Sequence, residues 1–440
     1  MKKTAMLLTL CMLMTTLCAC VPEESAISGG NGGEEQQQQV TDKLYARFMT
    51  NGDEENVTLS SGYEAVGDDL LFDMQEITKG GKLTVPSGAP TRNGFVFSGW
   101  AVDADGTKLW NFDDKVYSCV TLYAKWERSE ETEKVEYVEP KLSFKETVDD
   151  SEPLKLTGVL NSFVKNGAVS LTKIGLRRLA DNADNVKELL NYTIATGVTI
   201  TSATYVGNAI TVTYHSGGEE QSTVIRVNDV TESLKVDNAT YESKAAKYEQ
   251  KVSLPPYSVV MAGSSSMENW STSVEDMKPV TTANVGIGGT IVKQWTERLA
   301  PRLIYPLNPR AVVFYLGINN IINSKMTGEA TGNDIVELFE EVHLHLPDAQ
   351  IYFILINKVP GYTSYYGEMD IANAAAINFA ANNSYVTLID AGTKLEKATG
   401  KGNAAYFLTD GLHMSLCGYV IWGKEVKNSF IAKEREIYGL

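Results

Sequence analysis

The chain carries a serine, an aspartate and a histidine whose neighbours suit nucleophilic chemistry. Asp410 and His413 are three residues apart in the run LTDGLHM, on either side of a glycine turn. This spacing lets a carboxylate orient an imidazole, which can then serve as a general base. Ser265 lies in the run GSSSMENW, where a glycine permits a sharp turn and the serine would meet backbone N–H groups at the start of a helix. A serine hydroxyl becomes a good nucleophile when an imidazole takes its proton, so this set predicts acyl-transfer chemistry.

Two further runs offer groups that could stabilise an oxyanion. In NVGIGGT (284–290) three glycines within four positions allow a backbone to approach a substrate closely. In LGINN (316–320) the side-chain amide of Asn319 offers an N–H where negative charge could develop. Each run is weak evidence alone, because serines often cap helices and glycines often form plain turns.

The elements around these runs alternate between strand and helix. Short apolar runs rich in β-branched and aromatic residues predict strands that are buried on both faces. Segments with helical spacing or alanine-rich composition lie between them, which predicts right-handed crossovers and a three-layer α/β/α domain with a parallel sheet. Ligands of such folds meet the loops after the carboxyl ends of the strands. The predicted strands lie in the runs 256–263, 310–317, 350–356 and 384–392, with a further one before Asn284.

Together the four runs GSSS, NVGIGG, LGINN and DGLH resemble, in order, the signature blocks of the SGNH (GDSL-like) hydrolases. The resemblance covers roughly residues 236–435 and implies a flavodoxin-like serine esterase. It implies Ser265 as nucleophile with Asp410 and His413 completing a catalytic triad. It also implies an oxyanion hole formed by Ser265, Gly289 and Asn319. The implied reaction is two-step ester hydrolysis through an acyl-serine, with no metal and no organic cofactor.

The chain departs from the family pattern at two positions. Ser264 stands where the family more often has aspartate, and Asn320 stands where block III usually ends in aspartate. An asparagine still forms hydrogen bonds but carries no charge. These departures put the electrostatics of the loops in doubt more than the class of reaction.

The N-terminus reads as an export signal. Residues 1–20 contain two lysines, a short apolar stretch and the sequence LCAC, which resembles a bacterial lipobox. The resemblance implies cleavage before Cys20 and its lipidation, so that the chain is anchored outside the cytoplasm, to a bacterial membrane or the cell surface. Residues 21–40 are rich in Gly, Glu and Gln and predict a flexible stalk.

Two accessory regions precede the hydrolase-like domain, which we assign to residues 236–440. Residues 41–126 resemble the Listeria–Bacteroides B-repeat in GFVFSGW and LYAKW, which implies a small β-grasp-like module with an aromatic core. Residues 127–140 form an acidic linker. Residues 141–235 contain at least three alternating strands after a partly helical stretch, so we expect a second β-rich accessory domain.

Composition narrows the function but leaves three hypotheses open. A formal charge of −16 and a pI of about 4.9 argue against nucleic acid as a partner. The first hypothesis is an extracytoplasmic esterase that removes short acyl groups, above all O-acetyl, from a small molecule or a polysaccharide. The second is a lipase, lysophospholipase or thioesterase that uses the same triad. The third is an inactive surface binding or adhesion lipoprotein. The oligomeric state stays open.

Overall fold

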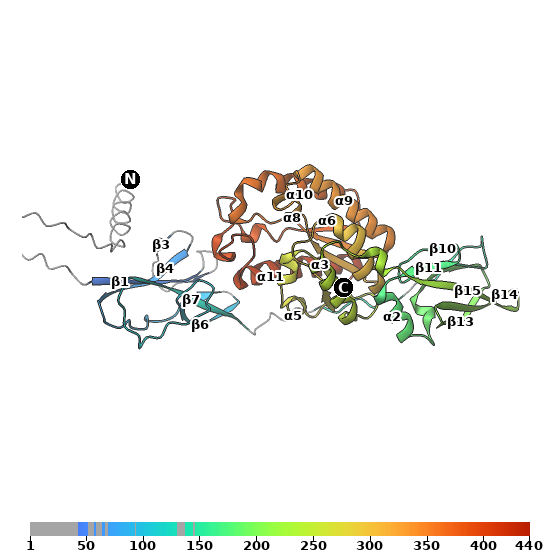
Figure 1. The fold of residues 1–440 in the computed structure, drawn as a ribbon, viewed down its shortest axis with the longest axis horizontal. Helices are drawn as coiled ribbons and strands as arrows, with labels where there is room; N and C mark the ends of the chain where they lie inside the picture. The colour runs from blue at the N-terminus through green and yellow to red at the C-terminus, as the bar shows by residue number, and fades with distance from the viewer. Residues whose placement is uncertain are drawn as a thin grey trace, which may run out of the picture. The chain divides into compact units, whose positions relative to one another are not determined.

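The computed structural model of the 440-residue chain describes residues 43–51, 57–58, 64–66, 69–92, 94–129, 137–143 and 146–440. The predicted signal peptide, the stalk and Cys20 lie outside these residues. The chain divides into two compact units, Met1–Glu131 and Thr132–Leu440, and each is described by itself (Figure 1). Among the described helices, none is long and apolar enough to cross a membrane.

The first unit is built on one seven-stranded sheet, in agreement with a β-rich N-terminal module. Its strand order is β2-β5-β6-β7-β1-β4-β3. Strands β1 and β7 pair in parallel, and the other neighbours pair antiparallel. The strands are β1 (Lys43–Met49), β2 (Val57–Thr58), β3 (Glu64–Val66), β4 (Asp69–Thr78), β5 (Thr91–Arg92), β6 (Phe95–Ala101) and β7 (Val120–Arg128).

An aromatic cluster fills the core of this sheet. The ring of Trp100 lies 5.0 Å from that of Phe48 and 5.1 Å from that of Phe97. Trp126 continues the cluster and contacts Phe97 with ring centroids 6.0 Å apart. Trp110, a third tryptophan of this module that we expected in the same core, is only half-buried. A small β fold without a disulfide depends on such rings for its buried apolar area.

The second unit begins with two β-sheets that share one apolar core. The smaller sheet has the order β8-β12-β9 and the larger one β10-β11-β15-β14-β13. Both contribute buried aliphatic side chains to the same cluster, which explains why strands here alternate between apolar and polar residues. The elements are β8 (Thr147–Val148), β9 (Leu154–Val159), β10 (Val164–Lys165), β11 (Ala168–Leu171), α2 (Lys173–Asp181), η1 (Val186–Leu189), β12 (Leu190–Ile194), β13 (Thr199–Val206), β14 (Ala209–Ser216), β15 (Glu219–Asp229) and η2 (Thr231–Leu234).

A five-stranded parallel sheet forms the centre of the remaining chain, as the sequence predicted. Its order is β17-β16-β18-β19-β20, and every neighbouring pair is parallel. Because β17 and β18 lie on opposite sides of β16, the chain reverses its winding direction there, and ligand sites of open α/β sheets lie beyond the carboxyl end of such a strand. The strands are β16 (Val259–Gly263), β17 (Thr282–Asn284), β18 (Ala311–Tyr315), β19 (Gln350–Ile354) and β20 (Val386–Ile389).

Helices cover both faces of this sheet and complete the three layers (Figure 1). Consecutive strand residues point to opposite faces. On β19, Tyr352 packs on Phe430 of α11 with ring centroids 4.5 Å apart, and Phe353 packs on Phe339 of α9 at 5.3 Å. The helices are α3 (Ala239–Lys251), α4 (Ser265–Asn269), α5 (Ser273–Asp276), α6 (Val292–Gln294) with the π-helical turn η3 (Trp295–Leu299), α7 (Ala300–Leu303), η4 (Tyr305–Leu307), α8 (Ile318–Ile322), α9 (Gly328–His345), η5 (Pro360–Tyr365), α10 (Tyr366–Ala380), η6 (Thr393–Leu395), η7 (Ala404–Tyr406) and α11 (Leu416–Tyr438).

Candidate active site

Ser265 begins the short helix α4 directly after β16, the strand at which the sheet reverses its winding direction. The turn between them requires Gly263, whose φ is +153°. A Cβ at that position would lie 2.3 Å from the carbonyl oxygen of Tyr315 on the neighbouring strand. Only glycine therefore lets the chain leave the sheet there, and the turn leaves Ser265 half-buried above the carboxyl end of the sheet.

The structure brings Ser265, His413 and Asp410 into one chain of hydrogen bonds. His413 Nε2 lies 3.0 Å from Ser265 Oγ, although the two residues are 148 positions apart. His413 Nδ1 lies 2.6 Å from Asp410 Oδ2. The side chains of His413 and Asp410 remain 27% and 46% exposed, so a substrate can approach the imidazole from solvent.

The DGLH turn holds the carboxylate of Asp410 in place. Partial burial raises the pKa of Asp410, but hydrogen bonds from the His413 side chain and from the backbone N–H groups of His413 and Leu412 outweigh it, so the pKa is lowered. Both backbone N–H groups donate to Asp410 Oδ1 at 2.9 Å, which leaves Oδ2 for the imidazole. A carboxylate that stays ionised can stabilise an imidazolium.

The NVGIGG loop packs against the serine turn through Glu268. The N–H of Gly288 donates to Glu268 Oε2 at 2.7 Å, and Lys244 pairs with the same carboxylate at 2.6 Å. A Cβ at position 288 would lie 2.5 Å from Glu268 Oε2 and 3.3 Å from Ser265 Cβ. The loop thus needs glycine in order to lie beside the serine.

Tyr241 of α3 lies against the same loop, and Lys244 of α3 is linked to it through Glu268; sequence reasoning anticipated neither residue. Gly289 has a φ of +87°, and a Cβ there would lie 2.4 Å from the hydroxyl oxygen of Tyr241. Glu268 had a local signal, because it follows Ser265 by one helical turn and so shares its face. Helix α3 lies outside all four sequence blocks, so nothing local pointed to Tyr241 or Lys244.

Asn319 lies in α8 just beyond the carboxyl end of β18 and is buried. Its Oδ1 accepts a hydrogen bond from Asn323 Nδ2 at 2.9 Å, and its Nδ2 donates to the carbonyl oxygen of Thr290 at 3.0 Å. These two contacts orient the amide and use one of its two N–H groups. They also tie α8 to the glycine loop that contains Gly289.

The two departures from the family pattern lie in different environments. Ser264 is fully buried, and its hydroxyl has no hydrogen-bond partner among the described residues. Asn320 is also fully buried, but its Oδ1 accepts from Val292 N at 3.1 Å and its Nδ2 donates to Asp334 Oδ2 at 3.0 Å. Asn320 therefore connects three segments through hydrogen bonds that need no charge of its own.

No cluster of three or more metal-ligating side chains occurs among residues that the structure describes. Residues 252–421 match the family model of the GDSL-like lipase/acylhydrolases, and residues 47–125 match that of the Listeria-Bacteroides repeat domain. The C-terminal part of this chain is a GDSL-like hydrolase domain. The enzyme class is therefore that of ester hydrolases, and the first unit carries a Listeria-Bacteroides repeat.

The solved structures that are similar to this chain each cover less than half of it and nearly all of their own length. A protein from Bacteroides fragilis that is described as an acylhydrolase is 20% identical to this chain. The match covers 46% of this chain and 99% of that chain, with a TM-score of 0.39. A GDSL-like lipase from Bacteroides thetaiotaomicron is 18% identical. That match covers 44% of this chain and 98% of the lipase chain, with a TM-score of 0.37. A family 3 carbohydrate esterase from Clostridium thermocellum is 13% identical. That match covers 42% of this chain and 100% of the esterase chain, with a TM-score of 0.35. A search of curated proteins finds no match.

Proposed function

We propose that Ser265, His413 and Asp410 are the catalytic triad of a serine esterase that removes short acyl groups, above all acetyl, from a carbohydrate. The observation that carries the proposal is the continuous path of hydrogen bonds from Ser265 Oγ through the imidazole to Asp410, with spacings of 3.0 and 2.6 Å. These distances suit proton transfer to and from a positioned base.

In the proposed reaction, His413 takes the proton of Ser265 as Oγ attacks the ester carbonyl carbon. Asp410 accepts a hydrogen bond from the Nδ1–H group of His413, which fixes the tautomer that leaves Nε2 free for this transfer. The tetrahedral intermediate then expels the alcohol, which receives the proton from His413, and an acyl-serine remains. Water attacks the acyl-serine by the same proton route and releases the carboxylic acid and free Ser265.

Three donors would stabilise the oxyanion: the backbone N–H groups of Ser265 and Gly289, and the N–H of Asn319 that Thr290 does not use. The hydrogen bond from Asn323 to Asn319 Oδ1 supports this role, because it fixes which end of the amide faces the glycine loop. Loss of one such donor typically costs about 10²–10³ in rate.

A carbohydrate ester suits the surroundings of the triad better than a long acyl chain does. The segment 358–370, which could have served as a lid, is tied down at several points. Gly361 N donates to Gly411 O at 2.9 Å beside the triad, and Gly402 N donates to Tyr366 Oη at 3.2 Å. The partly exposed rings of Tyr362 and Tyr365 lie on this segment and offer faces for a sugar.

We further propose that the enzyme acts outside the cytoplasm and is anchored by a lipid on Cys20. The lipobox-like end of residues 1–20 and the polar segment that follows support this location. An anchored enzyme with a surface-type repeat would meet polymeric substrates, whereas a freely diffusing metabolite needs no anchor.

Hydrolysis of p-nitrophenyl esters from acetate to decanoate tests the proposal. We expect the wild type to prefer acetate and Ser265→Ala to lose activity by roughly 10³-fold or more. Ser264→Ala is the matched control: it removes a neighbouring buried hydroxyl that has no hydrogen-bond partner in the described part of the chain, so activity should persist. A preference for decanoate would move the assignment to a lipase. Equal activity in the wild type and Ser265→Ala would refute the triad.

A further inference from the structure

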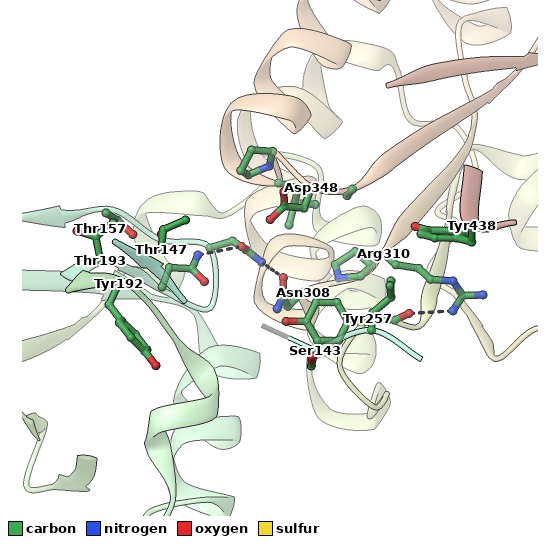
Figure 2. Close-up of a pocket in the computed structure, with 17 residues that line it drawn as sticks. Ser143, Thr147, Thr157, Tyr192, Thr193, Tyr257, Asn308, Arg310, Asp348 and Tyr438 are labelled. Atoms are coloured by element: carbon green, nitrogen blue, oxygen red, sulfur yellow. Dashed lines mark hydrogen bonds between the residues drawn. The ribbon is translucent and has the colours of Figure 1, made fainter. Parts of the chain in front are cut away.

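A cavity lies at the amino ends of the parallel strands, whereas Ser265 follows the carboxyl end of β16. It has a volume of about 590 Å³ and lies between the three-stranded accessory sheet and the loops that precede β16, β18 and β19. Figure 2 shows Thr147, Thr157 and Thr193 on one wall, with Asn308 and Asp348 among the residues across from them. The five residues of β16 separate this cavity from the serine by about 16 Å, at roughly 3.3 Å per residue. One small ester therefore cannot occupy both sites.

Neutral hydrogen-bonding groups make up most of the polar lining of this cavity, and Asp348 adds one carboxylate. Thr157 and Asn191 line it, and the hydroxyl oxygen of Thr193 is buried without a hydrogen-bond partner among the described residues. The charge of Arg310, which also lines the cavity, is matched by Glu434 at 3.0 Å and Glu139 at 3.0 Å. The lining thus offers an anion no uncompensated positive charge, and it favours an uncharged ligand rich in hydroxyl groups.

Three lining residues hold a backbone conformation that side chains rarely adopt. Asn161, Tyr257 and Asn308 have φ angles of +61°, +61° and +48°. Asparagine tolerates this region, but a residue as bulky as tyrosine is an outlier there. Such strain persists only where the surroundings enforce it, and it clusters at ligand sites.

Hydrogen bonds among these residues hold the strained conformation (Figure 2). Asn161 Nδ2 donates to Asn308 Oδ1 at 2.9 Å and to Tyr305 O at 3.0 Å. Tyr257 N donates to Asn308 O at 2.9 Å, and its own carbonyl accepts from Arg310 at 2.8 Å. The wall is therefore preorganised, and the rings of Tyr257 and Tyr438, each half-buried, are available to a ligand face.

We propose that this cavity binds a short segment of an uncharged glycan. Hydroxyl and amide groups of the lining would pair with sugar hydroxyls, and a tyrosine ring would cover the apolar face of a sugar. The further idea that this glycan is the polymer whose esters react at Ser265 rests on the proposed function, whereas binding itself does not. The accessory sheet would then hold a chain while the distant serine works along it.

Calorimetric binding to the full chain carrying Ser265→Ala tests this site without turnover. The probes are xylohexaose, mannohexaose, cellohexaose and, as a charged glycan, polygalacturonate. We compare Thr157→Trp, which fills the cavity from an exposed strand position, with Thr199→Trp, an exposed threonine of β13 outside the cavity. We expect at least one neutral hexaose to bind and Thr157→Trp to weaken it by about tenfold or more. Thr199→Trp should leave the affinity unchanged.

Thermal unfolding checks that both tryptophan variants are folded. If Thr157→Trp does not fold, Thr147→Trp replaces it, because Thr147 is a second exposed residue of the cavity wall. Absence of binding by every neutral hexaose overturns the inference, as does equal affinity in all variants or binding of polygalacturonate alone. The two proposals can fail separately. Glycan binding that is lost in Thr157→Trp, together with no ester hydrolysis by the wild type, would refute the esterase and leave this site standing.

Discussion

Asn320 shows how a single uncharged side chain takes over a position where the family usually has aspartate. It donates to Asp334 at 3.0 Å and accepts from Val292 N at 3.1 Å, so it uses both ends of its amide. Partial burial and the nearby Glu337 raise the pKa of Asp334. The hydrogen bond from Asn320 acts in the opposite direction but is the weaker effect, so the pKa of Asp334 remains raised. An aspartate at position 320 could accept from Val292 but would repel Asp334.

We therefore predict that Asn320→Asp destabilises the protein, because two carboxylates would meet at hydrogen-bond distance. The expected loss is about 1–3 kcal/mol at pH 7, measured by urea unfolding. The double variant Asn320→Asp/Asp334→Asn restores one donor and one acceptor and should recover most of this loss. If the double variant is no more stable than the single one, the contact between these residues does not explain the choice of asparagine.

At the scale of elements, α3 is fastened to α7 by a buried group of charges. Arg302 is fully buried and pairs with Glu249, also fully buried, at 2.9 Å and with Glu242 at 2.6 Å. Burial lowers the pKa of Arg302, but hydrogen bonds to the two carboxylates raise it more. Since α3 also carries Tyr241, this group positions the residue that lies over Gly289.

We predict that Arg302→Met costs about 3–5 kcal/mol, because it leaves the carboxylate of Glu249 buried without its cation. Lys293→Met is the matched control, since Lys293 and Glu297 form an exposed pair at 3.6 Å whose loss should cost at most about 1 kcal/mol. Both values come from denaturant unfolding at neutral pH. A similar small loss in both variants would show that the buried group contributes nothing beyond a surface pair.

The pH dependence of stability offers a separate test of this element. Burial raises the pKa of Glu242, but hydrogen bonds from Arg302 and from Val236 N outweigh it, so the folded pKa is lowered. A carboxylate whose pKa is lower in the folded than in the unfolded state stabilises the protein at pH values above its unfolded pKa of about 4.3. This stabilisation is lost as the pH falls through the folded pKa. Glu242→Gln should therefore flatten the decline of the melting temperature between about pH 5 and pH 3. An unchanged decline would contradict the assignment.

At the scale of the whole molecule, the boundary of the second unit has an energetic reason. Tyr137 and Glu139 lie before the accessory sheets yet contact Arg310, and Tyr137 also hydrogen-bonds to the buried Glu434 of α11. The end of the stretch we predicted as a linker is thus part of the packing of the hydrolase domain. The division into domains at residues 140 and 235 stays a prediction.

We predict that a chain of residues 132–440 hydrolyses p-nitrophenyl acetate with the same kcat/KM as the full chain. A chain of residues 141–440 lacks the buried ring of Tyr137 and should lose about 2–3 kcal/mol of stability, measured by urea unfolding. Equal stability of the two shortened chains would mean that the contacts of Tyr137 and Glu139 do not matter. Loss of activity in the longer of them would mean that the first unit takes part in catalysis.

Much of the fold and the site could be predicted because the signals are local. Four apolar runs predict four of the five strands of the parallel sheet, since burial on both faces leaves no polar alternation. Three of the four blocks directly follow a strand of this sheet, and parallel strands bring their carboxyl ends to one edge. That argument is enough to expect Ser265 and Asn319 to be neighbours, whereas His413 lies well beyond the end of β20 and was expected there only from the family resemblance.

The tertiary structure alone decided what touches the site from outside those blocks. Helix α3 places Tyr241 over Gly289, and the three-stranded accessory sheet closes a cavity against Tyr257 and Asn308. No spacing along the chain encodes these contacts, because they depend on how separate elements pack rather than on a repeat or a turn. Local patterns determine which elements form and what their ends carry, whereas shape complementarity between distant surfaces determines which of those ends meet.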